Sequence, residues 1–165
     1  MMRRIARLRV PLGLVFGALV LGLAAPTPQT LAIGAVIALG GEAVRIWAAG
    51  HLEKGREVTA SGPYAFTRHP LYLGSTIIGL GLAVGAGSLT AAAIVLGYLG
   101  VTLTAAIRTE EAHLTDKFGQ AYPEYRAGRT SVRRRFSLER ALRNREYRAA
   151  IGVVLVLLFL WGKTL

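Results

Sequence analysis

The chain has 165 residues, of which 53% are apolar and 20 are glycine, and its formal net charge is +11. This composition is too apolar and too rich in glycine for an ordinary soluble domain. The absence of cysteine excludes disulfides, thiolate nucleophiles and cysteine metal sites, and the three histidines lack the spacing of metal ligands, so we expect no metal.

Five apolar stretches follow one another along the chain. They predict an all-α fold, a multi-pass transmembrane helical bundle of about five spans that forms a single domain over residues 1–165. The last stretch covers only about 21 Å as a helix, against a hydrocarbon core of about 30 Å, and it needs flanking residues or a thinner bilayer to cross. The stretches are 10–25, 30–50, 71–86, 89–107 and 149–162.

The basic residues predict the orientation of these helices. Of the 20 lysines and arginines, 18 fall on one side of a five-span topology, and the exceptions are Arg45 and Lys163. Because basic residues stay in cytoplasmic loops, we expect the N-terminus and both long loops in the cytoplasm. Topology and anionic lipid then account for the charge without nucleic acid. Ala25-Pro26 is a poor cleavage context, so we expect a retained first helix rather than a signal peptide.

A short segment before the third apolar stretch concentrates ionisable and aromatic residues. Gly62-Pro63 predicts a turn, and Pro70 predicts the first turn of a helix. The start of that helix, with Arg68 and His69 beside it, favours binding of an anion. The alternative is that Arg68 and His69 contact lipid phosphates while Tyr64 and Tyr72 serve as interfacial anchors.

Two adjacent carboxylates, Glu110 and Glu111, end the fourth apolar stretch. Adjacent helical residues point about 100° apart, so they cannot serve one partner. Arg108 can pair with Glu111 at i, i+3, which leaves Glu110 free to accept hydrogen bonds from a ligand. The alternative is a solvated helix end with ordinary surface charges.

Two further features lie inside predicted spans. Gly79, Gly81 and Gly85 allow either close helix packing or close approach of a flat ligand. Glu42 and Arg45 share one helix face at i, i+3, and they form either a buried structural pair or part of a site.

These motifs together resemble the isoprenylcysteine carboxyl methyltransferase and phospholipid methyltransferase superfamily. The resemblance covers residues 51–135, and its features keep the family's order. It implies a small prokaryotic integral membrane protein, with its short C-terminal helical segment helping to form the cofactor site. The residues that carry it are Gly62-Pro63-Tyr64, Arg68-His69-Pro70, Tyr72, Gly74, Glu110-Glu111, Phe118-Gly119, Tyr122 and Tyr125.

The resemblance implies an S-adenosylmethionine-dependent methyltransferase that receives its cofactor from the cytoplasm and a lipophilic substrate from the bilayer. Its expected catalytic residues are Arg68, His69 and Glu110. The expected cofactor contacts are His69, Pro70, Tyr72, Gly74, Gly79, Gly81, Glu110 and Glu111. The expected substrate contacts are Arg68, Glu42, Arg45, Tyr64, Tyr122 and Tyr125.

The chemistry of the residues fits that implication. S-adenosylmethionine carries a carboxylate, an ammonium and a sulfonium, so it needs a cationic, an acidic and an aromatic surface. Arg68 and His69 provide the first, and Glu110 or Glu111 with Tyr72 the others. A carboxylate acceptor needs no general base, whereas an amine acceptor must lose a proton.

Two alternatives remain open at this point. Membrane sterol and enone reductases resemble the same superfamily and use NADPH, but they carry an Arg-Cys pair where this chain has Glu110-Glu111. A non-enzymatic lipid-binding protein could keep the fold and lose the site. A collapsed cavity, or one plugged by Tyr122, would favour the non-enzymatic protein.

Overall fold

The computed structural model describes the backbone of residues 2–129 and 134–165, and the side chains of the first helix from Leu12 onward. All regular structure in these residues is helical, which confirms the predicted all-α class. Part of the basic run at 133–135 lies outside the described residues. The helices are α1 (Met2–Leu23), α2 (Pro28–Ala49), the 3-10 turn η1 (Gly62–Ala65), α3 (Pro70–Gly85), α4 (Leu89–Phe118), α5 (Ala121–Arg126), α6 (Leu138–Arg143) and α7 (Tyr147–Gly162).

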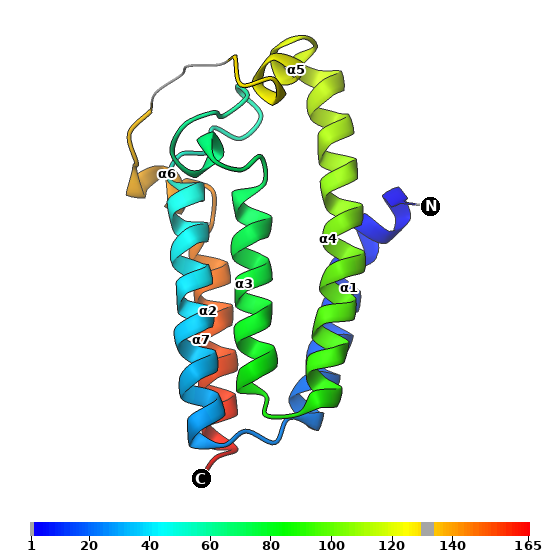
Figure 1. The fold of residues 1–165 in the computed structure, drawn as a ribbon, viewed down its shortest axis with the longest axis vertical. Coiled ribbons are helices and arrows are strands. Elements are labelled where there is room, and N and C mark those ends of the chain that lie inside the picture. Colours follow the sequence, from blue (N-terminus) through cyan, green and yellow to red (C-terminus); the bar gives the residue numbers. More distant parts are fainter. Residues whose placement is uncertain (1, 130–133) are drawn as a thin grey trace.

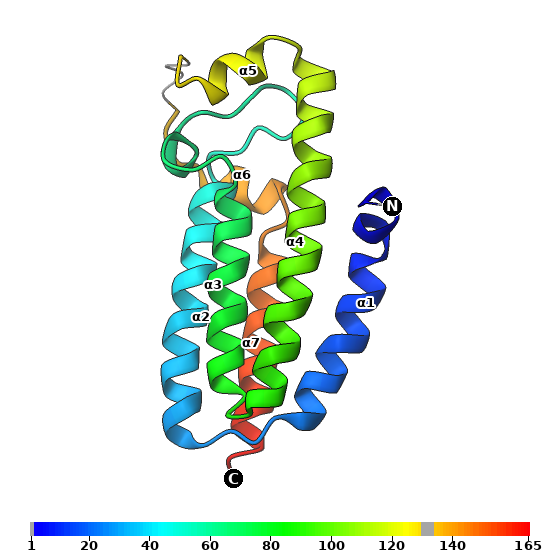
Figure 2. The ribbon, with the colours of Figure 1, turned by 45° about the vertical axis from the view of Figure 1, so that its right-hand side comes forward.

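The long helices run side by side, and the short ones gather at one end (Figure 1). Helices α2 and α3 form the most extensive contact, α7 packs mainly on α2, and α4 packs on α3. Helix α1 lies at the edge of the bundle against α4 (Figure 2). Both long loops therefore meet at the end that carries η1, α5 and α6.

Two helices, α2 and α4, are long and apolar enough to cross a membrane. The shorter apolar helices α3, α7 and the Leu12–Leu23 part of α1 lie alongside them. The arrangement is that of a helical membrane bundle. Helices suit the bilayer because they satisfy their backbone hydrogen bonds internally, where lipid offers no partner. The number of spans stays a prediction.

Glycines bring α2 and α3 together at backbone distance. A Cβ added to Gly74 would lie 2.8 Å from the Gly41 carbonyl oxygen, and one added to Gly81 would lie 2.6 Å from the Gly34 carbonyl oxygen. Any side chain there would force the helices apart. The two helices can pack this closely only because these four positions are glycine.

The end of the bundle opposite the long loops is tied together by polar contacts. The Ala25 amide donates to the Ala86 carbonyl at 2.8 Å, which joins the two short loops. The Lys163 ammonium donates to the carbonyls of Leu21 at 2.9 Å and of Ala24. The Leu21 carbonyl lies in the last turn of α1 and Ala24 directly follows that helix, so Lys163, which follows α7, ties the end of the edge helix to the end of the last helix.

The start of α3 agrees with the sequence, whereas the end of α4 differs from the predicted span. Helix α3 starts at Pro70, and α4 ends at Phe118 before Gly119, whose φ is +51°. Helix α4 runs eleven residues beyond the predicted span at 107, because its polar final turns continue past the apolar stretch. Between the long C-terminal loop and α7, which begins at Tyr147, the chain forms only the six-residue α6.

Candidate functional site

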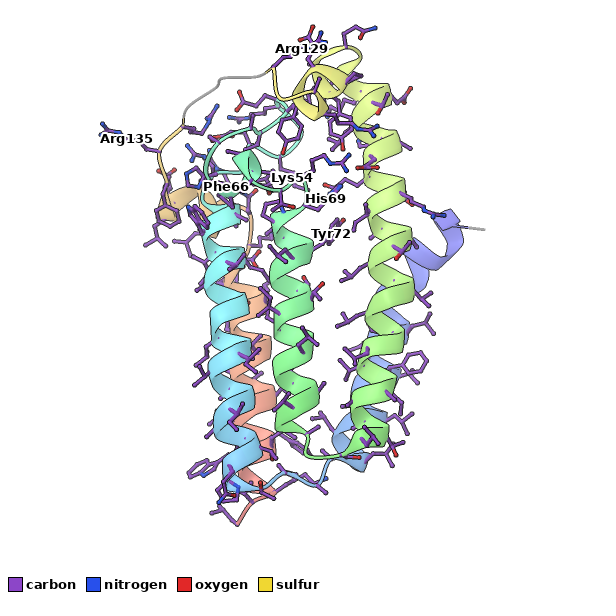
Figure 3. The ribbon with its side chains drawn as sticks, viewed as in Figure 1. Lys54, Phe66, His69, Tyr72, Arg129 and Arg135 are labelled. Atoms are coloured by element: carbon purple, nitrogen blue, oxygen red, sulfur yellow. The ribbon has the colours of Figure 1, made fainter. Side chains whose placement is uncertain are left out.

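The start of α3 places the Arg68-His69 pair at the end of the bundle. Gly62 has φ +60° and begins η1, which turns the chain so that Pro70 can open α3. His69 is the residue at the helix start, with φ −131° and ψ 57°, and its ring lies 5.7 Å from the Tyr72 ring. Figure 3 shows His69 and Tyr72 on the side of α3 that faces α4, with Lys54 above them.

One carboxylate oxygen gathers the polar groups of this region. Oε1 of Glu111 lies 3.1 Å from His69 Nε2 and 3.1 Å from an Arg68 guanidinium nitrogen. The Tyr122 hydroxyl donates to the same oxygen at 3.4 Å. Glu111 thus links α3, α4 and α5. The expected helical pair between Arg108 and Glu111 is wrong, since the ion pair found for this carboxylate among the described residues is with Arg68.

The electrostatics of this cluster follow from its contacts. The hydrogen bond with His69, together with the Arg68 charge, holds the pKa of the Glu111 carboxyl below its ordinary value. Burial, reinforced by the neighbouring Glu111 charge, raises the pKa of Tyr122 to about 12. Glu111 is therefore ionised and Tyr122 is a neutral hydrogen-bond donor at neutral pH.

Helix α5 covers the site from the loop end. The Tyr122 side chain is almost fully buried, and the Tyr125 hydroxyl donates to the Tyr64 carbonyl at 2.7 Å. That bond joins α5 to η1. Burial raises the pKa of both Tyr64 and Tyr125, so these phenols stay protonated as well.

Beneath this cover is a polar cavity of about 700 Å³ between α2, α3, α4, α5 and the 52–59 loop. Its size is typical of small-molecule sites, which span about 300–1,000 Å³. Glu110 lines it and has no ion pair or hydrogen bond among the described residues, whereas Glu111 is engaged by Arg68 and His69. Predicted site residues on its wall are Arg45, Tyr64, Arg68, His69, Pro70, Tyr72, Glu110, Tyr122 and Tyr125.

A buried ionic cluster forms the floor of this polar cavity. The Arg45 Nε lies 2.6 Å from Glu146 Oε1, and another guanidinium nitrogen lies 2.6 Å from Ser75 Oγ. Glu42 is 3.9 Å from Arg45, and neither of its buried carboxylate oxygens has a hydrogen-bond partner. Glu42 and Arg45 therefore pair as predicted, but Glu146 is the closer partner of Arg45 in this three-residue cluster.

The three predicted glycine contacts lie away from the polar cavity wall. Gly74 and Gly81 are buried against α2. A Cβ on Gly79 would collide with the Leu99 side chain of α4. In this structure the three glycines act as helix-packing positions.

A second opening, the α3–α4 groove, adjoins the polar cavity. It measures about 500 Å³, and His69, Tyr72 and Leu103 line both spaces. The rest of its wall includes apolar side chains such as Leu73 and Leu96, together with Thr76 and Thr104. These three side chains therefore stand between the polar cavity and a partly apolar groove along the helices.

Sequence reasoning missed several residues that shape the polar cavity. Asn144 donates to the carbonyls of Ala49 and Leu52, both at 2.9 Å, and it lines the cavity with Glu146. Arg140 donates to Glu53 at 2.7 Å and so holds the 52–59 loop. Arg140 and Glu53 are 87 positions apart, and Arg45 and Glu146 are 101 positions apart, so local sequence patterns could not have paired them. Only the fold brings them together.

Among the described residues, no three acidic or histidine side chains gather into a group that could hold a metal ion. The polar groups of the site surround a space that is large enough for a small organic molecule. Its chemical character is mixed, because Lys54, Arg68 and Lys117 share the wall with Glu57, Glu110 and Glu146.

Comparison with known proteins decides the family. The phospholipid methyltransferase family model matches residues 19–121, which is more than half of the chain and includes α2, α3, α4, the Arg68-His69 pair and the Glu110-Glu111 pair. The chain belongs to the phospholipid methyltransferase family. It is therefore a methyltransferase-family membrane protein, as the sequence resemblance predicted.

A curated relative gives a weaker likeness. The cobalt-zinc-cadmium resistance protein CzcN of Cupriavidus metallidurans is 34% identical over 83 residues. The match covers 49% of this phospholipid methyltransferase family member and 37% of the relative, so the chain spans well under half of that protein's length. No solved structure matches the chain.

Proposed function

We propose that this protein transfers a methyl group from S-adenosylmethionine to a lipophilic acceptor at the cytoplasmic face of a prokaryotic cytoplasmic membrane. The acceptor is the carboxylate of an isoprenylcysteine-like acid or a lipid head group. The observation that carries the proposal is the polar cavity, because its wall includes both family motifs, Arg68-His69 before α3 and Glu110 on α4. The cavity also adjoins the α3–α4 groove, which suits an acceptor from the bilayer.

The residues of the polar cavity fit the cofactor. A space of about 700 Å³ can enclose a nucleoside-sized ligand. The uncommitted carboxylate of Glu110 suits an ammonium or ribose hydroxyls, and Arg68, half-exposed beside the start of α3, suits a carboxylate. Tyr72 and Tyr64 offer aromatic faces to a cation. When bound, the cofactor supplies an electrophilic methyl group on a sulfonium.

The protein's own contribution is alignment and exclusion of water. Tyr122 and Tyr125 of α5 cover the polar cavity, and the Glu111 contacts fix Arg68 and His69 against α4. His69 and Glu110 lie on the wall, where each can accept or hold a proton if the acceptor is an amine. A carboxylate acceptor needs neither.

The orientation is also part of the proposal. The structure gathers the long loops, rich in lysine and arginine, at the end that carries the polar cavity. Basic loops stay in the cytoplasm, so the cofactor enters from there. The open cavity supports an enzyme over a non-enzymatic lipid binder, since neither collapse nor Tyr122 fills it.

The test is methyl transfer itself. Purified protein in detergent is incubated with S-adenosylmethionine labelled in its methyl group and with extracted bacterial lipids, and the label in the lipid phase is counted. We expect label in lipid with the wild type and a large loss with Glu110→Gln. Asp116→Asn is the control, because Asp116 is an exposed acid on the same helix and is absent from the polar cavity wall. Equal labelling by wild type and Glu110→Gln would overturn the site.

A further inference from the structure

Helix α6 lies beyond the residues that the family model matches. The match ends at residue 121, whereas α6 spans Leu138–Arg143. The Ser137 amide donates to the carbonyl of Gly50, the residue that ends α2, at 3.1 Å. Figure 1 shows α6 beside that end of α2. A surface formed by α6 is therefore a feature of this chain's C-terminal segment rather than of the matched region.

One side of α6 is fixed to the bundle. Ala141 is buried, and the side chains of Arg140 and Asn144 donate to backbone carbonyls around the end of α2. These contacts set which residues of α6 face outward. Leu138 and Leu142, at i, i+4 on another side of the helix, are 60% and 52% exposed.

Aromatic side chains surround the exposed leucines. Phe136 and Tyr147 flank α6 and are partly exposed, as is Trp47 in the last turn of α2. The His51 ring lies 6.3 Å from the Trp47 ring and 6.1 Å from the Phe136 ring, so it joins the two elements. Partly exposed aromatic residues at the ends of membrane helices are typical of the boundary between hydrocarbon and water. Helix α6 therefore lies at the level of that boundary.

The same surface has an excess of positive charge. Residues 134–148 include six arginines and two glutamates, and one of the two, Glu146, is paired with Arg45 inside the bundle. Arg135, Arg145 and Arg148 are exposed and have no ion pair among the described residues. Figure 3 shows Arg135 pointing away from the bundle. These cations are free to contact an anion outside the protein.

Arg145 has a backbone conformation that favours glycine. Its φ is +62°, and it follows Asn144, the residue that ends α6. Glycine is the usual residue at this position after a helix, because a side chain is strained at positive φ. An arginine here keeps a cation on the surface despite that strain, and strain of this kind points to a use for the side chain.

We propose that this surface binds anionic phospholipids of the leaflet beside the long loops. The leucines insert among the outermost acyl carbons, and the arginines contact the negative head groups. A lipid surface satisfies both kinds of side chain, whereas an acidic protein or a nucleic acid would leave exposed leucines on a protruding helix without apolar contacts. The proposal does not depend on the proposed methyl transfer. The α6 surface comprises Arg135, Leu138, Leu142, Arg143, Arg145 and Arg148.

The test uses a fluorophore whose emission reports the polarity around it. The chain has no cysteine, so Leu142→Cys provides a unique attachment point on the full-length protein. The labelled protein is placed in nanodiscs of phosphatidylcholine alone or of phosphatidylcholine mixed with phosphatidylglycerol. We expect the emission to shift toward that of an apolar environment in the anionic nanodiscs, and to return toward the neutral value at high salt.

Variants with equal loss of charge locate the effect. The pair Arg145→Gln and Arg148→Gln, introduced together, should reduce the anionic-lipid shift several-fold. Arg108→Gln with Arg129→Gln is the matched control, because both arginines are exposed on α4 or after α5 and lie outside the α6 surface. Figure 3 shows Arg129 near α5, well away from Arg135. Equal shifts in the two double variants would overturn the proposal.

Further arms keep the test decisive. Arg135→Gln should also reduce the shift, and it replaces the double variant if that protein fails to fold, because Arg135 lies outside the helices. Leu138→Ser should reduce the shift with every arginine in place. A wild-type emission that does not respond to phosphatidylglycerol would overturn the proposal. A response to added polyglutamate without a response to the lipid would assign the surface to an acidic protein instead.

Discussion

His69 and Glu111 are 42 residues apart in sequence, and His69 Nε2 lies 3.1 Å from Glu111 Oε1 across the α3–α4 contact. Arg68 reaches the same oxygen at 3.1 Å. One carboxylate on α4 therefore sets the position of two side chains that precede α3, and both of them line the polar cavity.

The first prediction concerns this positioning. Glu111→Gln removes the charge that holds Arg68 and His69, so both side chains should become mobile at the cavity wall. We expect affinity for S-adenosylhomocysteine to fall about tenfold, which corresponds to about 1.4 kcal/mol. Calorimetry in detergent measures it. Glu124→Gln on α5 is the control, because Glu124 is exposed and absent from the cavity wall. An unchanged affinity in Glu111→Gln would show that the cluster is not part of the cofactor site.

The second prediction concerns pH. The folded-state pKa of Glu111 lies below its ordinary 4.5, so its stabilising contribution is complete above that value and disappears as pH falls through the lowered pKa. Melting temperatures of wild type and Glu111→Gln should thus differ at neutral pH and converge in acid. The difference between the two melting temperatures is the informative quantity. Glu53 also has a lowered pKa, so its protonation in acid destabilises both proteins alike. A gap that persists below the lowered pKa would contradict the assignment.

The third prediction concerns the buried cluster at the cavity floor. Arg45→Met leaves Glu42 and Glu146 buried without their cation, and it should cost about 3–5 kcal/mol of stability. Glu42→Gln should cost less than about 1 kcal/mol, since neither carboxylate oxygen has a hydrogen-bond partner to lose. Thermal unfolding in detergent measures both. The double variant Arg45→Met/Glu146→Leu should recover part of the loss. A Glu42→Gln protein as unstable as Arg45→Met would refute this ranking.

The fourth prediction concerns the α2–α3 interface. Gly81→Ala places a methyl group against the Gly34 carbonyl, 2.6 Å away, and should destabilise the protein by about 1–3 kcal/mol. Gly97→Ala meets open space and should be neutral or slightly stabilising, because alanine favours helix by about 1 kcal/mol. Unfolding temperatures of the two variants make the comparison. Equal effects would mean that close packing does not hold α2 to α3.

Local chemistry made part of this structure predictable. Pro70 and Gly119 mark helix boundaries through backbone constraints that neighbours do not alter, and the all-α class follows from long apolar stretches. The two sequence motifs also meet at one cavity, as the resemblance implies. Their individual roles toward a ligand stay predictions.

The remaining features depend on contacts between distant residues. Arg45 pairs closely with Glu146 because α7 packs beside α2, and the helical spacing to Glu42 gave no sign of that partner. The sequence left both a ligand and a neighbouring helix open for Gly79 and Gly81 until the positions of α4 and α2 were known. The spacing of residues in the sequence describes the faces of a single helix. The Arg45–Glu146 pair and the glycine contacts depend instead on which helices pack against each other.

The measurement that tests the central claim most directly is a calorimetric titration of the purified protein in detergent. S-adenosylmethionine, S-adenosylhomocysteine and NADPH are titrated separately into the wild type and Glu110→Gln. We predict saturable binding of the first two ligands, none of NADPH, and weakened binding in Glu110→Gln. Binding of NADPH alone would contradict the methyltransferase assignment in favour of a reductase, and no binding of any ligand would favour a non-enzymatic protein.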